Sequence, residues 1–97
     1  MRLHNPESYQ LEGFDLGGKK SKYIAILKNK KTGELKRIPF GGKYPDGTPY
    51  EHFKDQIGHY SKYDHNDDKR RQNWLKRHKR NTDYKFSSAW FSKEFLW

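Results

Sequence analysis

The sequence predicts a small α+β domain in which an extended N-terminal arm precedes a β-hairpin and two C-terminal helices. Three observations support this fold class. Residues 22–40 hold two short apolar runs around a turn sequence. Residues 64–81 place Arg71, Trp74, Leu75 and His78 in one sector of a helix, and four of the nine residues 89–97 are aromatic. At 97 residues, with 31% hydrophobic but 16% aromatic residues, the chain has room for one domain built around an aromatic core.

The first 20 residues show no clear hydrophobic period. Asn5-Pro6 and Gly17-Gly18 are typical of loops, and apolar side chains are scattered between them. We therefore expect residues 1–20 to form an extended N-terminal arm, and residues 21–97 to form a single α+β domain.

The clearest strand is 22–28, a short β-branched and aromatic run, and 34–40 is expected to return beside it as the second strand of a hairpin. Residues 29–33 are typical of the turn, with Gly33 suited to a positive φ angle. Pro39 has no N–H to donate, so we expect it at a strand end or on a sheet edge.

Residues 50–57 are compatible with two structures. Their polar and apolar side chains alternate in a way that allows a third strand, but a short helix also fits. Gly58 ends the element in either case.

The strongest helix is expected over residues 64–81, with Asn66 or Asp64 as its N-cap. At about 100° per residue, one sector of the helix surface gathers the side chains that should anchor it, namely Arg71, Trp74, Leu75 and His78. A last short helix over 89–97 is expected to begin at Ser87 or Ser88. Most of its circumference is apolar and requires burial.

The net charge of +9 is concentrated in two blocks. Residues 19–43 contain nine Lys and Arg against one Glu, and residues 67–80 contain seven against two Asp. Blocks of this kind attract polyanions such as nucleic acid, an anionic surface or an acidic protein, although a solvated surface is the plain alternative. The predicted polyanion-binding residues lie on the hairpin and on the basic helix: Lys28, Lys30, Lys31, Arg37, Lys69, Arg70, Lys76, Arg77, Lys79 and Arg80.

The aromatic C-terminal segment has two interpretations. Trp90, Phe91, Phe95 and Trp97 either complete the core of the domain or form an interface with a partner protein, since Trp is enriched in interfaces. We expect some of them in the core and at least one against a partner.

Metal-dependent chemistry has little support in the sequence. There is no cysteine, and the histidines at 52, 59, 65 and 78 follow no known ligand spacing, so no metal or other cofactor is expected. His65, Asn73 and His78 loosely resemble a His-Asn-His nuclease arrangement. Both histidines flank one predicted helix, about 20 Å apart, which is too far to share a metal ion.

From Lys22 to Trp97 the chain resembles a family of small uncharacterised proteins encoded by large DNA viruses and some tailed phages. The matching residues are Phe40-Gly41, Tyr63-Asp64-His65-Asn66-Asp67, Arg70-Arg71, Trp74 (where Tyr is more usual), Arg77-His78, Ala89, Phe91-Ser92-Lys93 and Leu96-Trp97. The connection over 45–60 is longer than in that family. The resemblance implies a viral origin and a non-enzymatic accessory or virion role.

Charge, aromatic content and this resemblance together favour a non-enzymatic viral structural protein, a minor virion component that binds neighbouring subunits. A non-specific nucleic-acid-binding protein is the main alternative, and a His-Asn-His-like nuclease a remote one. Expected partners are other virion proteins or nucleic-acid phosphates, with no membrane and no small-molecule substrate. The expected location is the virion or the cytoplasm of the infected cell. No apolar run approaches the ~20 residues that span a bilayer.

Overall fold

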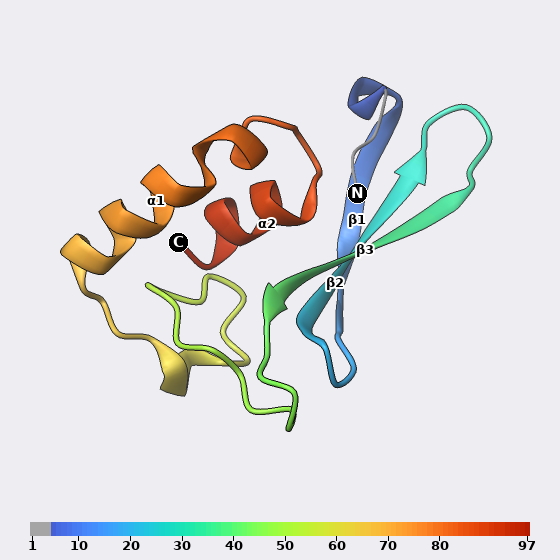
Figure 1. Cartoon of the computed structure of the whole chain (residues 1–97). Helices are drawn as coiled ribbons and strands as arrows, with labels where there is room; N and C mark the ends of the chain where they lie inside the picture. Colours follow the sequence, from blue (N-terminus) through green and yellow to red (C-terminus); the bar gives the residue numbers. More distant parts are fainter. Residues whose placement is uncertain (1–4) are drawn as a thin grey trace.

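Two helices pack on one face of a three-stranded antiparallel sheet, and α2 lies between the sheet and α1 (Figure 1). The computed structural model describes residues 5–97, so residues 1–4 of the expected arm lie outside the described part. Strand order is β1-β2-β3. The elements are β1 (Tyr9–Leu16), β2 (Ser21–Asn29), β3 (Leu35–Gly42), α1 (Asp68–Thr82) and α2 (Ser88–Phe95), with short 3-10 turns at Pro6–Ser8 and Ser61–Tyr63. The α+β fold class is confirmed.

The predicted hairpin is formed by β2 and β3. The Asn29 side-chain oxygen accepts hydrogen bonds from the N–H groups of Lys31 and Thr32, and Gly33 has a φ angle of +75°. These features close the turn as the sequence predicts. Pro39 lies in β3, an edge strand, where its missing N–H costs the sheet nothing.

The third strand of the sheet does not lie at residues 50–57, where the sequence allowed either a strand or a short helix. Residues 9–16, expected to be part of an arm, form β1 and pair with β2. A bulge between Leu11 and Gly13 reverses which side chains face the core, so Tyr9 is buried before the bulge and Phe14 is packed against the core after it. Residues 50–57 form neither a strand nor a helix.

The core is largely aromatic, as expected from the composition. Phe91 of α2 is completely buried and stacks on Phe40 of β3, with ring centroids 5.4 Å apart. Phe86 stacks on the Phe91 ring at 5.7 Å, and Phe14 meets it edge-on at 6.4 Å. Phe91 therefore joins α2 to two strands and to the segment before the helix.

Both helices form where predicted, but α1 begins later than expected. Its N-cap is Asp67, whose carboxylate accepts hydrogen bonds from the N–H groups of Lys69 and Arg70. Neither predicted cap is used: Asn66 has a left-handed φ angle of +52°, and Asp64 binds elsewhere. The expected Ser87 cap of α2 is confirmed, because its hydroxyl accepts the Trp90 N–H.

Replacing Phe91 with alanine should destabilise the domain by about 3–5 kcal/mol, because it leaves a cavity where four elements meet. Urea unfolding of the purified protein measures this loss. Leu16→Ala is the matched control, since Leu16 is 54% exposed and its truncation should cost little. A loss below about 1 kcal/mol for Phe91→Ala would contradict this description of the core.

Candidate polyanion-binding site

Helix α1 presents its cations to solvent and its aromatic side chains to the protein. All six predicted polyanion-binding residues of this helix are exposed, namely Lys69, Arg70, Lys76, Arg77, Lys79 and Arg80. On the opposite side, the Trp74 ring lies parallel to Trp97 at 5.1 Å and stacks on His78 at 4.2 Å. The division of this helix into an anchored side and a charged side is confirmed.

The outermost cations form a row along the helix. At about 100° per residue, Lys69, Lys76 and Arg80 fall within a sector of roughly 40° opposite Trp74. From Lys69 to Arg80 the row is about 16 Å long, a length over which one strand of a DNA duplex carries roughly five phosphates. Arg70 and Arg77 lie on the flank between this row and Trp74. We call the six predicted cations of α1 the basic ridge: Lys69, Arg70, Lys76, Arg77, Lys79 and Arg80.

Few of these charges are neutralised internally. Among residues 5–97, only Arg70 of the ridge forms an ion pair, with its Nη1 3.4 Å from Glu51 Oε1. Both side chains of this pair are about half exposed, so the pair adds little stability. The ridge therefore keeps most of its positive charge available to an outside anion.

The predicted residues on the hairpin form a separate patch. Lys28, Lys30 and Lys31 are exposed at or near the turn. Arg37 of β3 differs from them, because its Nη2 lies 3.1 Å from Asp15 Oδ2 of β1, on the other side of β2. The turn between β2 and β3 and helix α1 lie on opposite sides of the molecule, whose longest dimension is 40 Å (Figure 1). The structure does not bring the two patches together.

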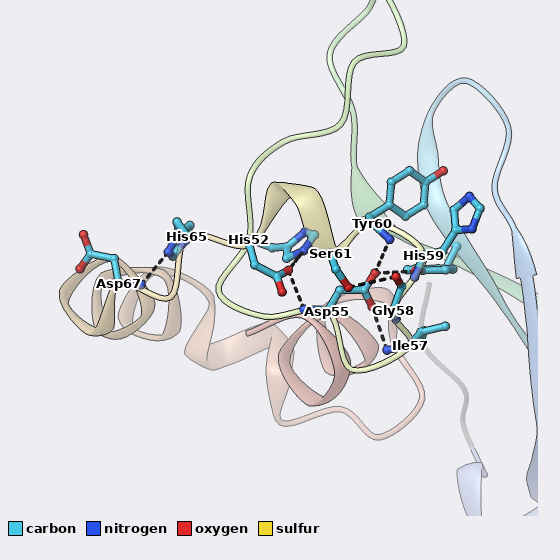
Figure 2. Close-up of polar contacts among 11 residues, drawn as sticks. His52, Asp55, Ile57, Gly58, His59, Tyr60, Ser61, His65 and Asp67 are labelled. Carbon is cyan, nitrogen blue, oxygen red and sulfur yellow. Dashed lines mark hydrogen bonds and ion pairs between the residues drawn. The ribbon is translucent and has the colours of Figure 1, made fainter.

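The position of α1 depends on a buried carboxylate in the connection before it. Asp55 accepts hydrogen bonds from the N–H groups of Ile57, Gly58 and Tyr60, so the chain wraps around it (Figure 2). The Tyr23 hydroxyl of β2 donates a fourth, at 2.5 Å. Burial alone would raise the pKa of Asp55, but these four bonds together outweigh it and lower that pKa.

A second carboxylate, Asp64, continues this network toward α1. Its Oδ1 accepts hydrogen bonds from the Asp55 N–H at 2.9 Å and from His52 Nε2 at 2.6 Å. Further along, His65 Nδ1 accepts the N–H of Asp67, the residue that caps the helix (Figure 2). Hydrogen bonds of Asp55, Asp64 and His65 thus connect β2 to the first turn of α1.

The same connection is also tied to the end of α2. The N–H groups of Lys54 and Gln56 donate to the backbone oxygens of Leu96 and Phe95. On the α1 side, Arg71 Nε donates to the Trp97 backbone oxygen at 2.7 Å. The connection, α1 and the C-terminal residues therefore hold one another in place.

The histidines are used for packing and hydrogen bonding. His52 is fully buried, His65 packs beside the Trp97 ring, and His78 stacks on Trp74. In the described part of the chain, no three His, Cys, Asp or Glu side chains come together to hold a metal ion. Within residues 5–97, the side chains of the loose His-Asn-His pattern are therefore not part of such a cation site.

The four predicted interface aromatics pack mainly within the domain. Phe91 is 0% exposed, so it lies in the core and cannot reach a partner in this fold. Phe95 meets Phe14 edge-on at 4.9 Å, Trp90 meets Phe86 at 5.3 Å, and Trp97 stacks on Trp74. These last three are half-buried and keep part of their surface.

No protein-family model, curated protein or solved structure matches the chain. Within residues 5–97, neither helix has the length and apolar character needed to cross a bilayer.

Sequence reasoning missed Lys22, which it treated only as the start of a strand. The side chain is 2% exposed, although lysine is rarely buried. Its burial results from packing against residues far away in the chain, so no local pattern signals it.

Acidification should destabilise the protein before its carboxylates titrate. Burial lowers the pKa of His52 and of His65 below the ordinary value of 6.5, so the folded protein holds both rings neutral. The unfolded chain takes up these protons near pH 6.5, and the free energy of unfolding should therefore fall as the pH drops below that value.

Urea unfolding at about pH 7.5 and about pH 5 measures this effect. His52→Gln should reduce the pH dependence, because its amide can still donate to Asp64 but cannot titrate. A protein that is equally or more stable at the lower pH would contradict the proposed neutral state of these rings.

Proposed function

We propose that the protein is a non-enzymatic viral or phage protein that binds nucleic-acid phosphates without base specificity through the basic ridge of α1. The observation that carries this proposal is the row of exposed, largely unpaired cations on a helix whose other side is fixed by Trp74. The viral origin rests on the resemblance described above.

Charge and spacing favour a phosphate backbone over an acidic protein. Lys69, Lys76 and Arg80 of the ridge form a row along one helix, and a phosphate backbone also presents its negative charges in a row. Lysine and arginine dominate the row, and both bind phosphate oxygens without reading base edges. The aromatic rings of α1 and α2 are engaged in stacking with each other and with the core, which argues against single-strand binding by base stacking.

The second candidate function is that of a minor virion component that joins two anionic surfaces. It is favoured by the second cationic patch at Lys28, Lys30 and Lys31, on the far side of the molecule from α1 (Figure 1). One molecule could contact nucleic acid with the ridge and an acidic neighbour with the hairpin turn. A location in the virion is part of this candidate function.

Binding to duplex DNA should weaken steeply with salt. If the ridge contacts about five phosphates, the log–log slope of affinity against salt concentration should be on the order of −4. Lys76→Gln combined with Lys79→Gln should bring the slope to about −2, because each lost phosphate contact removes ~1. Fluorescence anisotropy of a labelled duplex measures both slopes.

The matched control neutralises two exposed lysines outside the ridge, Lys54→Gln with Lys93→Gln. This variant has the same net charge and should keep the original slope. An equal loss in both variants would mean that net charge, and not the ridge, determines binding. If the virion candidate is right, Lys30→Gln with Lys31→Gln should prevent clustering of DNA with acidic partners while leaving DNA affinity nearly unchanged.

A further inference from the structure

A cavity of about 640 Å³ lies where α1, α2 and the end of β3 meet. Its lining includes Lys22 from β2 and Gly41 from β3, Arg70 and Arg77 from α1, and Ser92 from α2. The volume is in the range of small-ligand sites. Arg70 and Arg77 are the flank residues of the basic ridge, so the cavity opens beside the helix that carries it.

Lys22 is the unusual member of this lining. Its side chain is 2% exposed, and its ammonium has no ion pair and no hydrogen bond with any residue in 5–97. Burial lowers its pKa to about 8, while the negative charge of Asp55 partly opposes that shift. At neutral pH the side chain is thus mostly a cation that has lost much of its water and has no partner in direct contact.

The fold holds this lysine by close packing of its aliphatic stem. Gly41 has a φ angle of +80°, and a Cβ at that position would come within 3.0 Å of both Lys22 Cβ and Leu96 Cδ1. The stem therefore packs against the Gly41 backbone, close to the core residue Leu96. A buried cation without a partner costs stability, and such groups are concentrated at sites of function.

The other charged groups around the cavity favour an anion. Arg70 and Arg77 add two guanidinium groups, and the one carboxylate in the lining, Glu51, is paired with Arg70. Three cations against one paired carboxylate make the site selective for negative charge.

We propose that this cavity binds a phosphate monoester through the Lys22 ammonium and the Arg70 and Arg77 guanidinium groups, whose residues all line it. Guanidinium groups bind two phosphate oxygens at once, and the doubly charged monoester suits a site with three cations. A phosphodiester within a strand cannot reach a nearly buried ammonium, because the chain continues on both sides of it. The terminal phosphate of a nucleic-acid strand can enter the cavity.

The test compares the same duplex with and without 5′-phosphates, at a salt concentration that weakens ridge binding. The wild-type protein should bind the phosphorylated duplex at least about tenfold more tightly, because the terminal phosphate gains charge-assisted hydrogen bonds in the cavity. Fluorescence of Trp74 and Trp97, which both line the cavity, should change with the phosphorylated duplex alone. Lys22→Met should abolish the preference and raise the melting temperature of the free protein.

Two further variants test the same preference for the phosphorylated duplex. Ala89→Met fills the cavity from α2 without altering charge, and it should also abolish the preference even if Lys22→Met does not fold. Lys76→Gln with Lys79→Gln should weaken both duplexes and keep the preference, which separates this proposal from the proposed backbone binding. Equal affinity of the wild type for the two duplexes, or a preference that survives both cavity variants, would overturn it.

Competition with inorganic phosphate tests whether the cavity binds the end of a nucleic-acid strand or a free phosphate ligand. If the cavity serves strand ends, millimolar phosphate should compete only weakly with the phosphorylated duplex, because the ridge adds to the affinity for DNA. If inorganic phosphate binds as tightly as the phosphorylated duplex, and Lys22→Met abolishes that binding, the cavity is a site for a free phosphate ligand. That result would overturn the assignment to strand ends.

Discussion

The buried carboxylate of Asp55 is the interaction on which the rest of the structure depends. It is 5% exposed and receives four hydrogen bonds, one from the Tyr23 hydroxyl and three from backbone N–H groups. An ionised carboxylate is stable inside so small a domain only when its oxygens are satisfied in this way. The Asp55 N–H in turn binds Asp64, which leads to the first turn of α1. The sheet and helix α1 are therefore linked through polar groups as well as through aromatic contacts.

This arrangement explains how a chain with few aliphatic residues can present a cationic helix. The aromatic rings of the sheet and α2 supply most of the buried surface, and α1 is joined to them by the stacking of Trp74 on Trp97. The helix is then free to place lysine and arginine around the rest of its circumference. The same placement brings Arg70 and Arg77 beside Lys22, so the exposed ridge and the cavity share one wall.

The elements determined by local sequence were predicted well. The hairpin, its Gly33 turn and the Ser87 cap each depend on neighbouring residues, and so does the division of α1 into two sides. Strand β1 was missed because the bulge after Leu11 shifts the apolar positions from odd to even residue numbers and hides the period of two. Neither the strand nor the short helix that the sequence allowed over 50–57 forms, because backbone N–H groups of this segment donate to distant carbonyls, such as those of Tyr63, Leu96 and Phe95. The exposed cations of the ridge were visible in the sequence, whereas the cavity depends on Lys22, Gly41 and Leu96 lying close together, which only the tertiary fold creates.

Mapping of backbone amide chemical shifts by NMR during titration with a 5′-phosphorylated duplex tests most directly whether α1 and the cavity form the binding surface. We expect the largest changes along 69–80 and at Lys22 and Gly41, with little change in β1. Changes confined to the strands or the hairpin turn, with α1 unaffected, would contradict the assignment of function to the basic ridge.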